Sequence, residues 1–202
     1  MTVHFRPAQA EDAPTLDRIF NTSFCDTFAH LYRSEDLRAF LSSFGLEDWR
    51  AQIVDPAYAS RIAEVDGVAA GYAKLGPVKI PVETDRPAIL LDQLYVLKEH
   101  HGAGIARELM DWAFDEAARR GAEEMYLTVY VDNHRARRFY DRYGFEAVGR
   151  YDFMVGYHAD EDIIMRKVLC AASTLSAPAR SGPFRTAFSA VVEAFRAASL
   201  RA

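Results

Sequence analysis

The chain has 202 residues, of which 50% are hydrophobic and 26% charged, and its formal net charge is −5. This length and apolar fraction predict one compact domain with some chain to spare, and they exclude a disordered or low-complexity protein. Apolar runs are too short to span a bilayer and two cysteines are too few for a disulfide framework, so a cytoplasmic protein is expected.

The charge is unevenly distributed along the chain. Residues 1–169 carry 20 basic and 28 acidic residues, whereas residues 170–202 carry four arginines and one glutamate. An acidic body disfavours nucleic acid as a partner and would attract cationic ligands, although solubility alone also explains such a balance.

The first half of the chain predicts four strands and three helices. A strand over 3–6 is followed by a helix from Asp12, a helix over 34–44 capped by Ser34, and a short helix over 48–54. Strands over 61–65 and 68–75 flank Asp66–Gly67, a pair typical of a tight hairpin turn. A proline-containing loop over 76–87 then leads into an apolar strand over 88–96.

The second half alternates helices and strands. A helix is expected from Gly104 to about residue 120, a strand over 124–131, a helix over 133–143, and strands over 146–154 and 161–168. The run 160–162 (Asp-Glu-Asp) is interpreted as a turn, and an acidic surface facing a cationic substrate is its alternative. This order predicts an α/β sandwich around a mixed sheet.

The last residues form a separate segment in this interpretation. Residues 171–182 are rich in small residues and proline, and apolar residues then recur at helical spacing over 184–199. We therefore expect one domain over 1–169 and, over 170–202, a linker with an amphipathic helix. That helix packs on its own domain or, in the alternative interpretation, on a second subunit in a homodimer.

The segment 97–107, between an apolar strand and a helix, carries the strongest chemical signal. Gly102 and Gly104 precede the helix, so backbone amides and the helix dipole can bind a phosphate or pyrophosphate there. A P-loop is excluded because no Gly-Lys-Ser/Thr follows. A dinucleotide-binding fold is disfavoured because Arg107 occupies the third glycine position. In addition, the candidate ribose-binding acid, Asp132, lies 30 residues after Gly102, against an expected interval of ~20.

Two motifs resemble the GNAT superfamily, the Gcn5-related N-acetyltransferases. The first is the run Leu94-Tyr95-Val96 followed by His101-Gly102-Ala103-Gly104-Ile105-Ala106. The second, Asn-x-x-Ala-x-x-Phe-Tyr-x-x-x-Gly-Phe, is matched by residues 133–145. The resemblance implies a GNAT-like α/β/α sandwich with a mixed, mostly antiparallel twisted sheet, acetyl-CoA as cosubstrate, and no metal.

The resemblance also implies a role for each matched position. The cofactor-binding positions are Leu94, Tyr95, Val96, His101, Gly102, Ala103, Gly104, Ile105, Ala106, Arg107 and Asn133. Backbone groups of Leu94 and Val96 would pair with the pantetheine arm as an added strand does, and the amides of 102–107 would hold the pyrophosphate. The Asn133 side chain would bond the pantetheine, although it is also a helix cap, and Tyr140 would protonate the departing thiolate.

Two positions depart from the family pattern. His101 stands where Arg or Gln is usual, which predicts weaker or pH-dependent phosphate contact. Thr128 stands five residues before the motif asparagine, where some relatives place a catalytic Glu, and a threonine cannot be that base. Asp92, a carboxylate in an apolar strand, is the proton acceptor chosen instead, with a structural hydrogen bond as its alternative.

The acceptor is expected to be a small-molecule primary amine. The segment 26–32, together with residues 153–156 and 162–165, resembles bacterial polyamine acetyltransferases, which makes a polyamine the leading candidate. The alternatives are a protein or peptide amine, an amino-sugar antibiotic, and a non-catalytic module that senses acetyl-CoA. No nucleic acid and no membrane is expected among the partners.

Overall fold

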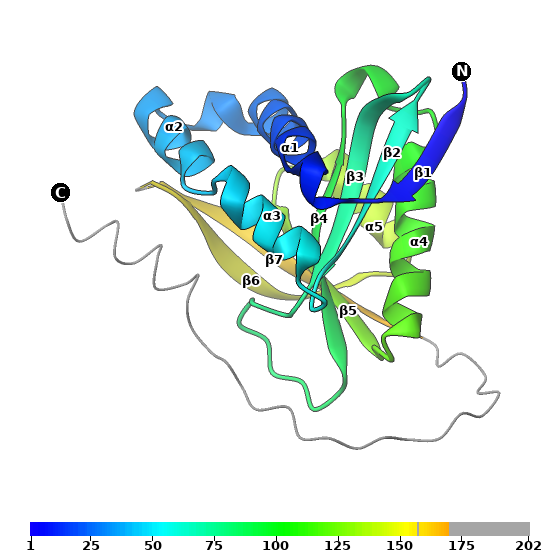
Figure 1. Cartoon of the computed structure of the whole chain (residues 1–202). Coiled ribbons are helices and arrows are strands. Elements are labelled where there is room, and N and C mark those ends of the chain that lie inside the picture. Colours follow the sequence, from blue (N-terminus) through cyan, green and yellow to red (C-terminus); the bar gives the residue numbers. More distant parts are fainter. Residues whose placement is uncertain (157, 170–202) are drawn as a thin grey trace. The chain divides into compact units, whose positions relative to one another are not determined.

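A computed structural model describes residues 1–156 and 158–169 of the chain, and the predicted tail lies outside them. The described residues form a seven-stranded sheet in the order β1-β2-β3-β4-β5-β7-β6, with helices on both faces (Figure 1). The elements, in chain order, are β1 (Val3–Pro7), α1 (Ala13–Phe28), α2 (Ser34–Ser42), α3 (Leu46–Val54), β2 (Ala59–Val65), β3 (Val68–Gly76), β4 (Ala88–Val96), α4 (Ile105–Arg119), β5 (Glu124–Tyr130), α5 (His134–Arg142), β6 (Glu146–Val155) and β7 (His158–Val168). The expected α/β class and mostly antiparallel sheet are confirmed.

The parallel pair β4–β5 divides the sheet into two antiparallel parts. Strands β1 to β4 pair antiparallel in sequence order, whereas in the other part β7 lies between β5 and β6 and is antiparallel to both. Only three residues of β4, 88–90, pair with three residues of β5, 124–126. Beyond these pairs the two strands diverge.

Each face of the sheet has its own apolar core. On one face, buried residues of α4 such as Leu109 and Ala113 pack with strand residues such as Leu75, Leu127 and Met165. The other core is built from α1, α3 and the opposite faces of β2 and β3, with these residues fully buried: Leu16, Ile19, Trp49, Ile62 and Tyr72. Burial of these large side chains contributes about 1.5–3 kcal/mol each, so the two layers hold the sheet between them.

Most predicted elements appear within one or two residues of their expected ends. In the β2–β3 hairpin, Asp66 and Gly67 have φ angles of 49° and 82°, the left-handed conformation that a tight two-residue turn requires. The third helix begins at Leu46, two residues early, because the Asp48 carboxylate accepts the Gly45 N–H at 2.8 Å. Arg33, not Ser34, is the N-cap of α2.

The interpretation of residues 160–162 as a turn is wrong. All three residues lie inside β7, which begins at His158, and the preceding turn contains Gly156 with a φ of 60°. Asp160 is 4% exposed and Asp162 is 7% exposed, because they share the face of β7 that packs inward. No helix in the described part of the chain is long and apolar enough to cross a membrane.

Candidate functional site

The loop between β4 and α4 presents free backbone amides at the start of a helix. Gly102 and Gly104 have φ angles of 84° and 83°, and a Cβ at either position would meet no atom within 4 Å. Glycine is therefore required here by backbone conformation and not by lack of space. Within the described residues, no acceptor is bonded to the amides of residues 102, 104, 105 and 106.

Two amides of the predicted cradle are already bonded within the loop. The Arg107 N–H donates to the Gly104 carbonyl at 3.0 Å, and the Ala103 N–H donates to the His100 carbonyl at 3.4 Å. The free amides of the first turn lie at the positive end of the 15-residue helix α4, where the helix dipole favours an anion. The Arg107 side chain is exposed and lies 3.9 Å from Asp111.

His101 links this loop to the end of β4 and to α5. Its Nε2 lies 2.8 Å from the Val96 carbonyl oxygen, and the Arg135 guanidinium lies 2.6 Å from its Nδ1. A neutral ring that donates from Nε2 can accept from Arg135 at Nδ1. The positive charge beside the loop thus comes from Arg135, a residue that the motif did not indicate.

Beyond its pairing with β5, one side of β4 has no partner strand, and the Val96 carbonyl on that side is bonded to His101. The Leu97 N–H donates to the Ala70 carbonyl of β3 at 2.8 Å. Because successive residues of a strand alternate in direction, the backbone groups of Leu94 and Val96 point away from β3, toward the side where β5 has diverged. The Tyr95 ring instead packs on the α1 face, 5.6 Å from the ring centre of Phe20.

Asp92 occupies a bulge in β4 and is paired with a cation. The register shifts here, since Lys74 is opposite Gln93 while Leu75 is opposite Leu91. Lys74 Nζ lies 2.9 Å from Asp92 Oδ2 and also donates to Gln52 Oε1 at 2.7 Å. The Lys74 side chain is 4% exposed, so the ion pair keeps a buried ammonium compensated.

Helix α5 and its N-cap carry the two side chains of the second motif to which the resemblance gives a role, Tyr140 and Asn133. Asn133 Oδ1 accepts the Ala136 N–H at 3.1 Å, so Asn133 is the helix cap, while its Nδ2 has no partner among the described residues. Tyr140 lies two turns further on and is 9% exposed, between the rings of Phe139 and Phe145. Burial raises the pKa of the Tyr140 hydroxyl, so it stays protonated at neutral pH.

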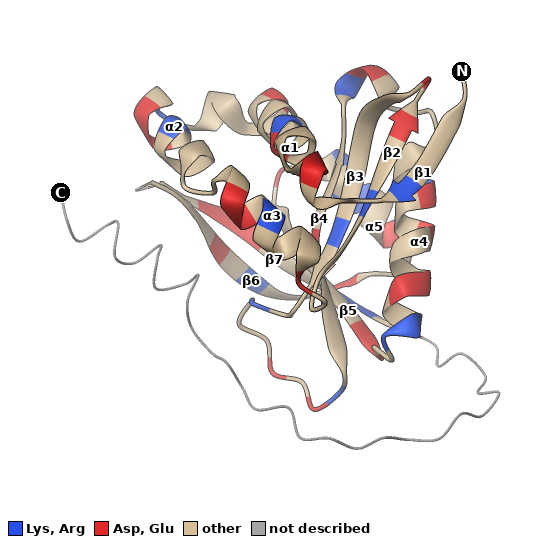
Figure 2. Cartoon of the chain, viewed as in Figure 1, with Lys and Arg blue, Asp and Glu red and all other residues tan. Residues whose placement is uncertain are grey.

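A group of tyrosines and carboxylates lies on the α1 side of β7, and its two acids belong to the run for which a surface facing a cationic substrate was the alternative interpretation. The Tyr32 hydroxyl donates to Asp160 Oδ2, and His158 Nε2 lies 3.1 Å from Asp160 Oδ1. Asp162 lies opposite Tyr130 of β5 and Tyr151 of β6. Figure 2 shows the acidic residues of β7 among the strands. Residues 158–164 (His-Ala-Asp-Glu-Asp-Ile-Ile) do not alternate between polar and apolar residues, so the sequence offered no clear strand signal here.

Tyr95 brings the two halves of the candidate site together. Its pKa is raised first by burial, and then by the nearby Tyr140, Asp92 and Asp162 groups. Tyr140 belongs to the α4–α5 face and Tyr95 to the α1 face. At this level β4 and β5 are no longer paired, so no strand ladder separates the side chains of the two faces. The structure therefore brings three predicted residues, Tyr95, Asp92 and Tyr140, to the divergence of the two strands.

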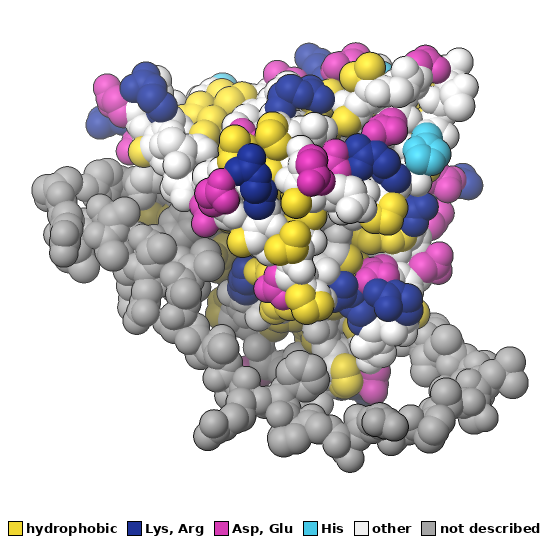
Figure 3. Space-filling model, viewed as in Figure 1, with side chains coloured by type: hydrophobic (Ala, Val, Ile, Leu, Met, Phe, Trp, Pro, Cys, Tyr) yellow, Lys and Arg dark blue, Asp and Glu magenta, His cyan; other side chains and the backbone are white. Residues whose placement is uncertain are grey.

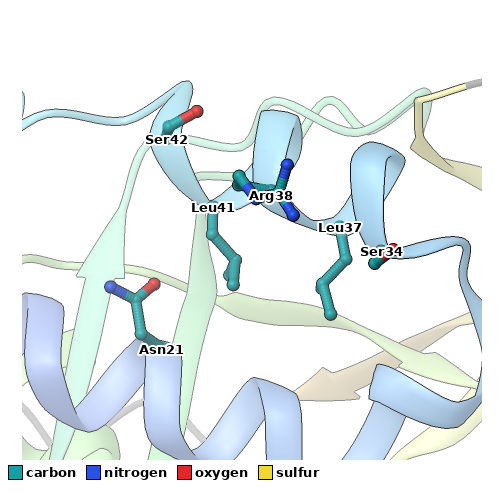
Figure 4. Close-up of a pocket in the computed structure, with 6 residues that line it drawn as sticks. All are labelled: Asn21, Ser34, Leu37, Arg38, Leu41 and Ser42. Carbon is teal, nitrogen blue, oxygen red and sulfur yellow. The ribbon is translucent and has the colours of Figure 1, made fainter.

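A surface hollow of about 420 Å³ lies elsewhere, between α1 and α2 (Figure 4). Leu37 and Leu41 of α2 point toward the α1 helix, which contributes Asn21. None of its lining residues is among the predicted site residues. On the face shown in Figure 3, basic and acidic side chains are interspersed over the described surface.

The protein has an α/β fold in which two parallel strands of a mixed sheet diverge. The gap can accept an extended ligand, and the free amides of the glycine loop beside it can bind an anionic group of that ligand. The acetyltransferase (GNAT) family model matches residues 18–145. An uncharacterized N-acetyltransferase of Mycobacterium tuberculosis (strain ATCC 25618 / H37Rv) is 36% identical over 117 residues, 58% of this chain and 71% of the relative. The chain belongs to the GNAT family and is an N-acetyltransferase.

Solved structures share the fold over most of the chain. The PaiA N-acetyltransferase of Thermoplasma acidophilum, solved in complex with coenzyme A, matches with a TM-score of 0.68 and 22% identity, over 83% of this chain and 99% of that one. The yncA protein of Salmonella typhimurium, a putative acetyltransferase solved with its cofactor acetyl-CoA, gives a TM-score of 0.60 and 23% identity over 88% and 100%. At these identities the likeness concerns the fold.

Proposed function

We propose that the protein transfers an acetyl group from acetyl-CoA to a primary amine, in a ternary complex and by direct attack, and that the acceptor is a polyamine. The observation that carries the proposal is the position of free backbone groups. The open edge of β4 ends at a loop with free amides, and a buried phenol lies beside that edge. Two of the similar structures hold coenzyme A or acetyl-CoA, which supports this cosubstrate.

The described residues fit such a carrier. Amides of residues 102, 104, 105 and 106 would bond the pyrophosphate, with the Arg135 charge close by. The extended pantetheine arm would pair with the backbone of Leu94, with the Val96 carbonyl in place of His101, and with the free Nδ2 of Asn133. Ala103 and Arg107 would shape the loop, since their own N–H groups are bonded within it.

The reacting groups follow from this placement. The Val96 N–H points to the open side of β4 and would stabilise the oxyanion of the tetrahedral intermediate, a contribution of roughly 3 kcal/mol for one such donor. Tyr140 would give its proton to the departing thiolate. Because burial raises its pKa, the hydroxyl is protonated and available at neutral pH. Asp92 as proton acceptor stays a prediction, since Lys74 already balances its charge.

The polyamine assignment is supported by charge. Residues 1–169 include 28 acidic and 20 basic residues. Two of the acids, Asp160 and Asp162, lie on β7 near the divergence of β4 and β5. Two carboxylates on one face of a strand, two residues apart, are separated by roughly 7 Å along it. This spacing suits two ammonium groups joined by a short alkyl chain.

A side-by-side acceptor assay tests the proposal. Spermidine, an amino-sugar antibiotic and a basic peptide are offered with acetyl-CoA, and release of free thiol is measured. We expect the highest kcat/KM for spermidine. Transfer to another amine with none to spermidine would contradict the polyamine assignment, and acetyl-CoA binding without transfer to any amine would indicate a sensor module.

A further inference from the structure

Asp162 is a buried carboxylate that faces no cation. It is 7% exposed, and no ion pair joins it to any residue that the structure describes. The other two carboxylates near the site are partnered, Asp92 by Lys74 and Asp160 by His158 and the Tyr32 hydroxyl. An unpaired buried carboxylate is costly, and a protein retains one most readily where a cation comes to it.

The groups around Asp162 come from five elements. Thr128 and Tyr130 face it from β5, Tyr151 from β6 and Asp160 from its own strand. Burial is the main cause that raises the pKa values of Tyr95 of β4 and Tyr32 of the turn after α1, and the Asp162 charge is a smaller cause in both. Each of these described polar neighbours is a hydroxyl, a phenol or another acid. These groups form a polar lining that accepts a cation and supplies none.

We infer that Asp162 is the catalytic base that takes the proton from the ammonium group of the acceptor. The inference deepens the proposed function and rests on it. Its ground is position: Asp162 lies opposite Tyr130 of β5, beyond the last paired residues of β4 and β5, and Tyr140 is buried on the opposite face of the sheet. The acceptor amine would therefore lie between its base and the thioester.

The proton balance of the step is complete with these groups. The ammonium gives one proton to the Asp162 carboxylate, which later releases it to solvent. The neutral amine then attacks the thioester carbonyl, so that a C–N bond forms and the C–S bond breaks. Tyr140 protonates the leaving thiolate and recovers a proton from the new amide nitrogen. The products are the acetylated amine and the free thiol of coenzyme A.

The environment makes Asp162 a better base than an ordinary carboxylate. Burial raises its pKa to about 6, the Thr128 hydroxyl lowers it, and the Asp160 charge raises it further. An alkyl ammonium with a pKa near 10.4 is only on the order of 0.1% neutral at pH 7. A base whose pKa is closer to 7 makes the proton transfer from this ammonium less unfavourable. Asp92, by contrast, is already paired with Lys74.

Asp162→Asn tests the assignment against Asp92→Asn, with Glu161→Gln as a matched control. Glu161 is the adjacent acid on the same strand and pairs at the surface with Arg150, so its removal should leave kcat unchanged. Asp162→Asn should lower kcat at least 100-fold at pH 7 while calorimetry shows unchanged coenzyme A binding. The wild-type kcat/KM should fall as the pH drops below about 6, and Asp162→Asn alone should lose this limb.

The outcomes separate the inference from the proposed function. If Asp162→Asn keeps the wild-type rate and acid limb while the wild-type enzyme acetylates amines, the inference is wrong and the proposed function stands. The same holds if the limb disappears only in Asp92→Asn or in His158→Gln. If the wild-type enzyme transfers acetyl to no amine, both fail.

Thermal unfolding supplies a second readout. The folded state raises the pKa of Asp162, so it favours the protonated form, and the ionised carboxylate lowers stability above about pH 6. Asp162→Asn should therefore melt at a higher temperature than the wild type at pH 8, and the difference should vanish near pH 4. A variant that melts lower at pH 8 would show a structural role and contradict the inference.

Discussion

Two buried side chains near the divergence of β4 and β5, a phenol and a carboxyl, respond differently to burial. Tyr140 and Asp162 are both buried and both lack a charged partner in the described residues, and burial raises the pKa of each. The phenol stays protonated as a result, whereas the carboxyl titrates near neutral pH. Burial on the two faces of the sheet would thus provide both an acid and a base.

Replacement of Tyr140 by Phe removes the proposed acid and keeps the ring. We expect kcat to fall about 100-fold, because the thiolate then leaves without a proton donor, while the KM for acetyl-CoA stays within twofold. Steady-state kinetics with a saturating amine measure both values. Tyr58→Phe, the same change on the loop before β2, is the control, and equal rates for the two variants would remove Tyr140 from the mechanism.

The residue chemistry near β7 was the part least accessible from sequence. Asp160 is bonded to Tyr32, which is 128 residues away along the chain, and no local pattern reports such a contact. The bulge that turns Asp92 toward Lys74 is likewise a property of the paired strands β3 and β4. Local patterns indicate backbone motifs well, but they do not reveal which acids end up paired.

At the scale of elements, the loop and first turn of α4 could be predicted because their chemistry is local. Two glycines before an amphipathic helix indicate free amides at its start, and the φ angles of both glycines agree with that interpretation. Helix starts were less accurate. Leu46 begins α3 because a side chain three positions into the helix caps it, which outweighs the position of the first apolar residues.

Gly104→Ala tests the loop conformation. Alanine at a φ of 83° costs roughly 1–2 kcal/mol, so either the loop rearranges or its amides turn away from the anion. Calorimetry should show coenzyme A binding at least tenfold weaker. Gly149→Ala in β6 is the control, because its φ is ordinary and its added Cβ would make only a 3.5 Å contact with Ile164. Equal binding by both variants would show that the amides of this loop do not hold the carrier.

At the scale of the whole described molecule, a buried carboxylate joins three segments. Glu124 of β5 is 3% exposed and accepts hydrogen bonds from Tyr126 at 2.7 Å and from Thr84 of the 77–87 loop at 2.8 Å. Arg166 of β7 lies 3.7 Å from its other oxygen. The Tyr126 hydroxyl is the main cause of a lowered pKa at Glu124.

Glu124→Gln should reduce stability in a pH-dependent manner. Because the folded state lowers the pKa of Glu124, its ionised form contributes stability above the ordinary value of 4.5 and loses it as the pH falls through the lower folded value. We expect a loss of about 1–3 kcal/mol at pH 7 that shrinks below pH 4, measured by urea unfolding. Glu123→Gln, the exposed neighbour, should have little effect at either pH. A deficit that does not change with pH would contradict this account.

The short pairing between β4 and β5 has a mechanical consequence. Three residue pairs form the seam between the two antiparallel halves of the sheet, and each half keeps its own ladders intact on either side. A small rotation about this seam would alter the span from the β4 edge to Tyr140 at little cost in backbone bonding. Acyl chains of different width could then be admitted by a change of twist, without repacking of either core.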